Sequence, residues 1–412
     1  MATRLPVLVA GTFDSKAEEH LFLQSRIEAR GFSVKTMNLG TRSPSPFRAD
    51  HDLFHDLIED PSGPKGRDEC IRTVLEGGKK LVKKLHRQGH ISAVISLGGG
   101  TGTHLATGIM RILPLGFPKV MVSTVASRDM SGIVGTSDIT MMHSVADILG
   151  VNSILGEIVD RAAGAVCGMA DGQWRPQGKN ECVALSMFGF ITTAAEAAKA
   201  HLEQKGYEVV CFHANGTGGM AMEELAAEGR FSGILDLATH ELADELKGGY
   251  CRGIGPRRLE PPPERNIPRL VVPGGLDCAV LEFTRENIPP PYRNRKIFFY
   301  DFRSAVRLTR EETRQMARQL AQRLNKSPSH NQILIPLKGW SEADCENGPL
   351  YDVEIRDAFI REIKGHLHPE IKVRMLDLHI NDAGFAQSAA EAMDRMIRQS
   401  HPNRLSAPVG EG

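Results

Sequence analysis

The first half of the chain alternates short apolar runs with longer stretches whose apolar positions recur at helical spacing. Runs long enough for buried strands lie at residues 5–10, 32–37, 93–97 and 119–124. Helical patterns lie at residues 17–30 and from Lys65 to about Gln88. Strands that alternate with helices in this way predict a parallel sheet with right-handed crossover connections.

The second half repeats the order of these parts. Strand-like runs at residues 182–187 and 207–212 enclose a helical pattern at 194–205, and another helix is expected at 220–228. We therefore expect an α/β protein with two Rossmann-like, doubly wound domains on mostly parallel sheets, with a cleft between them. The expected domains are residues 1–178 and 179–405, followed by a disordered tail at 406–412.

Residues 40–66 interrupt the pattern of the first half. Pro44, Pro46, Pro61 and Pro64 punctuate them, and a short helix is expected at residues 51–59. The segment is too long for a routine connection. It is therefore interpreted as a lid over a site or as a surface excursion.

A glycine-rich loop follows the strand at residues 93–97. It consists of Gly98, Gly99, Gly100, Thr101, Gly102 and Thr103, and a helical pattern begins directly behind it. Backbone N–H groups in such a loop, together with the positive end of the helix dipole, suit a phosphate or carboxylate. The alternative is a tight strand-to-helix turn that binds nothing.

Two other stretches of the first half have the same two interpretations. Asp14, Ser15 and Lys16 follow the first strand, either as helix caps or as a second anion-facing turn to which Lys16 adds charge. Arg67 lies in the first turn of its helix, where a cation is disfavoured unless an anion is near. The lysines later in that helix are interpreted as a solvated face.

The second half carries a comparable loop with Asn215, Gly216 and Gly218, directly after His213. One such loop in each domain could hold a phosphorylated ligand from two sides. His213 is a hydrogen-bonded structural residue, a general base or a partner of a phosphate. Residues 240–244 read HELAD and lack the second histidine of a zinc-protease helix, so a zinc site is rejected there. Carboxylates near strand ends, among them Glu241, are caps or Mg²⁺ ligands, and no metal ligand is assigned.

Composition narrows the class of protein. Lys plus Arg equals Asp plus Glu at 50 each, and aromatic residues make up 6%, which argues against nucleic acid or anionic membrane as a partner. The seven cysteines include no CxxC pair, which suggests a reducing compartment. Residues 1–8 lack a signal-peptide pattern and no run is long enough for a membrane helix, so we expect a cytoplasmic protein.

Known nucleotide motifs are absent. No GxxxxGK[ST] occurs, and Gly98, Gly100 and Gly102 alternate too tightly for the GxGxxG dinucleotide fingerprint. No GxSxG nucleophile elbow is present, and no Ser/His/Asp triad can be assembled from spacing.

At its motifs the chain resembles the family that contains the ATP-binding N-terminal half of the tomato tobamovirus-resistance protein, with bacterial and fungal relatives. The matching segments, in order, are GTFDSK from Gly11, KGRDECI from Lys65, SLGGGTGT from Ser96, LPLGFPKVMVSTVAS from Leu113, GTSDITMMHSVADILGVN from Gly135, MFGFITT from Met187, FHANGTGGMAME from Phe212, GGLD from Gly274, LIPLKGWSEAD from Leu334 and HINDAGFA from His379. They span nearly the whole chain, so the resemblance is specific.

The resemblance implies two Rossmann-like domains, a homodimer, and an ATP site in the first domain. By motif, that site would use Asp14, Ser15, Lys16, the loop Gly98 to Thr103, and Ser123, Thr124, Ala126 and Ser127. Arg128 replaces the family's usual glycine and would fill part of the pocket. Tyr300 and Asp301 replace the usual His-Asn pair, which leaves the second domain's ligand open.

Three functions are compatible with these features. The first is an ATP-binding enzyme, with Mg²⁺, that acts on a small acid or a phosphorylated metabolite, with Lys16 and Arg67 countering phosphate charge. The second is a nucleotide-gated protein-binding module, because the family's plant member binds a viral replication protein. The third is an ATP-independent enzyme on a small sugar or keto acid, with His213, Asn215 and Glu241 supplying the chemistry.

Overall fold

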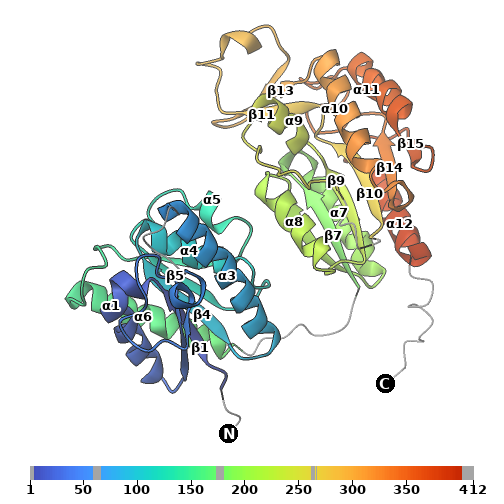
Figure 1. The fold of residues 1–412 in the computed structure, drawn as a ribbon. Coiled ribbons are helices and arrows are strands. Elements are labelled where there is room, and N and C mark those ends of the chain that lie inside the picture. The colour runs from blue at the N-terminus through green and yellow to red at the C-terminus, as the bar shows by residue number, and fades with distance from the viewer. Residues whose placement is uncertain (1–3, 59–65, 173–180, 261–264, 266, 401–412) are drawn as a thin grey trace. The chain divides into compact units, whose positions relative to one another are not determined.

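The structure is a computed structural model that describes residues 4–58, 66–172, 181–260, 265 and 267–400. The chain divides into two compact units, Met1–Pro176 and Gln177–Gly412 (Figure 1). Each unit contains a six-stranded sheet whose strand pairs are all parallel. The prediction of an α/β fold with two mostly parallel sheets is confirmed.

The first sheet has the strand order β3-β2-β1-β4-β5-β6. In that order the strands are His51–Asp52, Val34–Asn38, Val7–Gly11, Ala93–Gly98, Lys119–Ser123 and Thr140–His143. The helices of this unit are α1 (Phe13–Glu28), α2 (Leu53–Leu57), α3 (Arg67–Arg87), α4 (Gly100–Met110), α5 (Ser131–Val134) and α6 (Ser153–Ala170).

Strand periodicity distributes the apolar residues of β1 between two cores. Val7 and Val9 pack with residues of α1 and α6 on one face, and Leu8 and Ala10 pack with residues of α2, α3 and α4 on the other. Because successive side chains of a strand point to opposite faces, a strand covered on both sides must be apolar throughout. All five residues of β1 are buried, as that rule requires.

The second sheet has the order β15-β14-β10-β9-β7-β8. Those strands are Lys372–Leu376, Asn331–Pro336, Arg269–Gly274, Gly233–Ala238, Cys182–Met187 and Glu208–His213. The helices are α7 (Thr192–Gln204), α8 (Thr217–Ala227), α9 (Glu241–Lys247), α10 (Arg310–Leu324), α11 (Val353–His366) and α12 (Ala383–Ser400), with 3₁₀ turns η1 (Gly189–Ile191), η2 (Pro290–Tyr292) and η3 (Pro328–His330). Residues of α7 and α12 share one core, and residues of α10 and α11 share another.

A small antiparallel sheet is attached to the second unit. It has the order β11-β13-β12, with strands Cys278–Leu281, Ser304–Arg307 and Ile297–Phe299. The sequence pattern did not predict it, and it did not predict β6 either.

The described part of residues 40–66 is attached to the first sheet. β3 pairs with β2, Asp50 Oδ2 accepts from the Thr36 N–H at 2.8 Å, and Asp52 Oδ1 accepts from Asn38 Nδ2 at 2.8 Å. The expected helix is confined to α2, and residues 59–65 lie outside the described ranges. These bonds tie Asp50 and Asp52 to the edge of the sheet, whereas the interpretation of the segment as a lid stays a prediction.

Candidate functional site

A pocket lies in the first unit where β1 and β4 end side by side. The sheet order reverses between these two strands, and open α/β sheets bind ligands at the carboxyl ends of strands flanking such a point. The pocket has a volume of about 290 Å³. It is lined by Thr12, Asp14, Ser15, Lys16, Thr41, Arg42, Arg67, Gly99, Gly100, Thr101 and Gly102.

The N-terminus of α4 enters this pocket without a cap. Gly99 is the N-cap residue and has no side chain to accept a hydrogen bond, and the first turn contains no acidic residue. The amide N–H groups of Gly100, Thr101 and Gly102 donate no hydrogen bond to another described residue. Such N–H groups and the helix dipole together form a site for an anion.

The glycines of this loop serve two different purposes. A Cβ on Gly98 would lie 3.0 Å from the Cα of Gly102, so Gly98 allows α4 to approach the end of β4 closely. A Cβ on Gly100 would meet nothing within 4 Å, and one on Gly99 would lie 3.7 Å from Thr124 Oγ1. Gly99 and Gly100 therefore leave open space rather than relieve a clash.

Three cationic side chains surround the uncapped helix end. Arg67 Nη2 donates to Thr101 Oγ1 at 3.5 Å, and Arg42 and Lys16 line the other walls. Lys16 lies at a kink inside α1, with φ −136° and ψ 38°, and its Nζ donates to the carbonyl of Ile148. The helix expected from residue 17 therefore begins earlier, at Phe13, and bends at Lys16.

Asp14 organises the pocket wall opposite the glycines. Its Oδ2 accepts from the N–H groups of both Thr41 and Arg42 at 2.9 Å, so the loop after β2 is held against the start of α1. Gly40 gives this carboxylate room, since a Cβ there would lie 2.8 Å from Asp14 Cγ. Asp14 Oδ1 makes no hydrogen bond with the described residues and is available to a cation.

Several residues expected at the site lie beneath it instead. Thr103 Oγ1 and Ser123 Oγ are 2.7 Å apart and fully buried, so they bind each other and tie α4 to β5. Gly98, Ala126 and Ser127 are outside the pocket lining, as is Thr124. Arg128 is exposed and does not line the pocket, so the expectation that it fills the site is wrong.

The glycine-rich loop of the second unit is occupied by the protein's own side chains. Asn215 Oδ1 accepts from the N–H of Gly218 at 3.0 Å, and Glu241 Oε2 accepts from the N–H of Gly216 at 2.9 Å. These two oxygens take two of the loop's backbone donors, whereas the N–H groups of Thr217 and Gly219 donate to no other described residue. The geometry therefore gives no support to a cofactor role for Asn215, Gly216 and Gly218.

Glu241 belongs to a buried ion cluster. Its Oε1 accepts from Arg258 Nε, and Arg258 also binds Asp236 through Nη2 and Oδ1 at 2.6 Å. Burial raises the pKa of Glu241, and the guanidinium of Arg258 opposes that effect. A fully buried, ion-paired carboxylate cannot exchange protons with a substrate, so the catalytic assignment of Glu241 is not supported.

His213 lies at the surface rather than in a cavity. It is exposed, and its Nδ1 is 3.2 Å from the carbonyl oxygen of Met187. Tyr300 packs edge-on against Phe190 at 5.0 Å between ring centroids, and Asp301 forms an ion pair with Arg303 at 2.7 Å. These residues have structural partners, and none of them lines the first-unit pocket.

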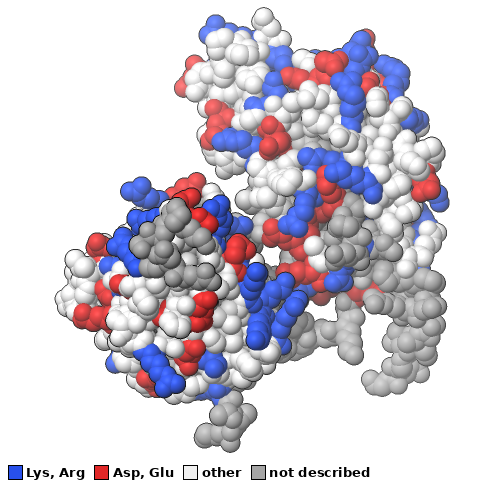
Figure 2. All heavy atoms as spheres, in the orientation of Figure 1, with Lys and Arg blue, Asp and Glu red and all other residues white. Residues whose placement is uncertain are grey.

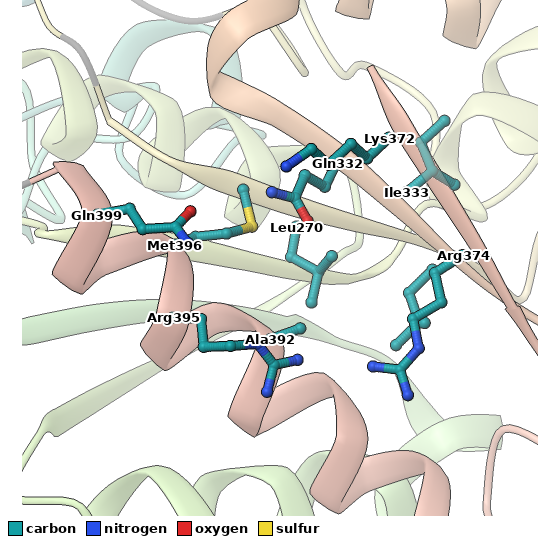
Figure 3. Close-up of a pocket in the computed structure, with 10 residues that line it drawn as sticks. Leu270, Gln332, Ile333, Lys372, Arg374, Ala392, Arg395, Met396 and Gln399 are labelled. Carbon is teal, nitrogen blue, oxygen red and sulfur yellow. The ribbon is translucent and has the colours of Figure 1, made fainter. Parts of the chain in front are cut away.

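A second cavity of about 140 Å³ lies near the amino-terminal ends of β10, β14 and β15 in the second sheet. Figure 3 shows Leu270 among the residues that line it, with Arg374 of β15 and Arg395 of α12 pointing toward one another. Leu270, Gln332 and Lys372 lie within the first two residues of their strands, at the end of the sheet where α/β proteins rarely bind ligands. Cations near the end of α12 are also favoured by the helix dipole. We therefore take the first-unit pocket as the candidate site.

Basic and acidic side chains are interspersed over the face of the molecule that Figure 2 shows. Within the described ranges, no helix combines the length and the apolar character that crossing a membrane requires.

Sequence reasoning missed part of the pocket wall. Thr41 and Arg42 follow β2 and reach the site only because Asp14 binds their amides. Thr12 directly follows β1 and lines the pocket, but it was not predicted as a site residue. β1 and β2 are parallel neighbours, so the loop after β2 begins at the same end of the sheet as the loop after β1. This pattern could have placed Thr41 and Arg42 at the site.

Comparison with known sequences gives matches over nearly the whole chain. Residues 5–175 match the N-terminal domain of the uncharacterised protein family UPF0261, and residues 180–397 match its C-terminal domain. A UPF0261 protein of Clostridium tetani is 35% identical over 404 residues, covering 95% of this chain and 99% of that protein. The ToMV resistance protein Tm-1(GCR237) of Solanum lycopersicum is 35% identical over 312 residues, covering 74% of this chain and 41% of the tomato protein.

Among solved structures, a UDP-N-acetylglucosamine 2-epimerase from Rickettsia bellii aligns over 98% of this chain and 99% of its own. The identity is 12% and the TM-score is 0.24, so this likeness carries no functional argument. The sequence matches to both domains do decide the family. The chain belongs to the UPF0261 family, with the tomato Tm-1 proteins among its relatives.

Proposed function

We propose that this protein binds ATP, with Mg²⁺, in the first-unit pocket. The observation that carries the proposal is the uncapped N-terminus of α4, which meets Lys16, Arg42 and Arg67 at the switch point of a 3-2-1-4-5-6 sheet. Mononucleotide-binding α/β domains place phosphates at this position. The pocket lining contains three cations and one carboxylate, Asp14, so its net charge is +2.

Asp14 is the candidate Mg²⁺ ligand. Mg²⁺ in nucleotide sites is held by one or two carboxylates together with phosphate oxygens and water. Two backbone N–H groups hold Asp14 Oδ2 in place. They thereby fix the orientation of the carboxylate, whose other oxygen, Oδ1, is the proposed ligand of the ion. A bound Mg²⁺ would neutralise phosphate charge next to this residue.

An enzyme and a nucleotide-gated binding module differ in what the bound nucleotide does. Lys16 holds the carbonyl of Ile148, which lies between Val145 and Leu149, whose exposures are 70% and 78%. A phosphate that recruits Lys16 would remove this hydrogen bond and loosen a loop with exposed apolar side chains, while Glu19 would still hold the N–H of Gly150 and Ile148 would stay in the core. This favours a module whose protein-binding surface responds to nucleotide, while phosphoryl transfer to a small acid remains the alternative.

Calorimetric titration tests binding. Wild type should bind ATP more tightly in the presence of Mg²⁺, and more tightly than inorganic phosphate. Lys16→Ala should lose roughly 1–3 kcal/mol, or about 5- to 150-fold in Kd, through the loss of a charged hydrogen-bond donor. Lys80→Ala, an exposed lysine of α3, is the matched control and should bind as wild type does.

The same samples distinguish the two uses. Release of phosphate on addition of Mg²⁺ and small carboxylic acids would support the enzyme. Altered proteolytic cleavage at residues 145–150 when ATP is bound, without turnover, would support the gated module. If ATP and inorganic phosphate bind equally well, the pocket is a simple anion site and the nucleotide proposal is wrong.

A further inference from the structure

A second group of chemically active side chains lies in the other unit, at the start of α9. His240 and Asp244 are one helical turn apart, so both face the same side, and the turn after α9 returns Cys251 to them. Each offers a ligand atom, and these atoms lie within 4.8 Å of one another. The three residues are buried, with exposures of 0%, 0% and 5%.

Both ring nitrogens of His240 are buried without a hydrogen-bond partner among the described residues. An imidazole always carries both a donor and an acceptor or two donors. Phe188 stacks on the ring at 3.9 Å between centroids, which fixes its plane. An unpartnered buried nitrogen is costly, so a missing partner is the simplest explanation.

Asp244 is positioned by the chain around it. Its Oδ1 accepts from the N–H of Val280, and its Oδ2 accepts from the N–H of Cys251, both at 2.7 Å. Each oxygen retains a lone pair. Hydrogen bonds of this kind orient a carboxylate for a metal ion, and one of them links Asp244 directly to the cysteine.

We propose that His240, Asp244 and Cys251 bind a zinc ion. The pattern at residues 240–244 predicted no zinc site because it lacks a second histidine, but the fold brings Cys251 to His240 and Asp244 instead. Nitrogen, oxygen and sulfur ligands suit this borderline-soft cation. A thiolate and a carboxylate cancel its two charges, so the buried complex would be neutral. Ligand atoms on tetrahedral zinc are roughly 3.3–3.8 Å apart, so the three side chains need to close by about 1 Å.

The proposed site has an open fourth position. Three protein ligands leave one position for water or a small ligand, as in catalytic zinc sites. Tyr250, next to Cys251, is 44% exposed, so the chain beside the site reaches the surface. This proposal is independent of ATP binding in the first unit.

Metal analysis of the full-length protein tests it. Purified protein should contain zinc, and after chelation it should take up one Co²⁺ per chain. Cobalt should produce a thiolate-to-metal charge-transfer band and the strong visible bands of tetrahedral coordination, and added zinc should abolish them. Because a metal ion binds the thiolate form of cysteine, binding at neutral pH should release about one proton per ion.

Variants locate the ion. Cys251→Ser should lose the charge-transfer band, and His240→Gln should weaken metal binding at least tenfold, with circular dichroism confirming that both are folded. Cys70→Ser removes a cysteine of equal exposure, 5%, in the other unit and should behave as wild type. The proposal is overturned if folded wild type takes up neither ion, or if the cobalt spectrum survives in Cys251→Ser.

Discussion

At the scale of single residues, His20 shows how tightly the candidate site is built. The ring is buried, its Nδ1 lies 2.6 Å from the carbonyl oxygen of Lys16, and a Cβ on Gly11 would lie 1.9 Å from its Nε2. Nδ1 therefore carries the proton in the neutral ring, and Nε2 faces backbone that cannot accept a hydrogen bond. Burial lowers the pKa of His20 to about 4 from its ordinary 6.5.

Acid should therefore destabilise the first unit through His20. The unfolded chain binds a proton below about pH 6.5, whereas the folded chain resists it until about pH 4. Stability from this residue is full above pH 6.5 and is lost as the pH falls to about 4, by about 3 kcal/mol in total. Urea unfolding of wild type and His20→Gln across this range measures it, and equal pH dependence in the two proteins would contradict it.

At the scale of elements, the pocket depends on a unit of strand, loop and helix. The first N–H groups of its helix, α4, have no hydrogen-bond acceptor among the described residues. The apolar run of β4 and the glycines after it made this unit predictable, because burial on both faces and a close helix approach leave a clear sequence signature. β6 was not predictable, since its residues are polar or only half-buried at the sheet edge. Ser123 was expected at the ligand because a sequence does not show that its hydroxyl binds Thr103.

Gly99→Asp should separate helix stability from ligand binding. Gly99 has extended backbone angles, φ −79° and ψ −162°, which aspartate adopts freely. Its carboxylate would cap α4, so the free energy of unfolding should stay equal or rise by a few tenths of a kcal/mol. The same charge would repel phosphate, so ATP binding should fall at least tenfold, while Gly99→Ala should bind nearly as wild type does. Unfolding and calorimetry on both variants decide it, and equal ATP affinity in them would argue against phosphate at α4.

At the scale of the whole molecule, the two units share their order of parts but not their use of the glycine-rich loop. The repeated pattern allowed both sheets to be predicted, with β7 at the expected residues. The site roles in the second unit could not be predicted, because Arg258 lies far along the chain from Asp236 and Glu223 and yet binds both. Long-range ion pairs of this kind leave no periodic signal in a sequence.

The carboxylate of Glu241 at the second glycine-rich loop has a consequence for engineering. This carboxylate fills an anion-binding position, and removing it by substitution should leave that position free for an anion from solution. Glu241→Ala should lose roughly 1–3 kcal/mol, because Arg258 Nε and the N–H of Gly216 lose their acceptor while Arg258 keeps its ion pairs with Asp236 and Glu223. Formate or acetate, sized for that vacancy, should restore part of the loss in thermal unfolding, whereas chloride at equal ionic strength should not. Rescue would mean that the second unit contains an anion-binding site that the side chain of Glu241 normally fills.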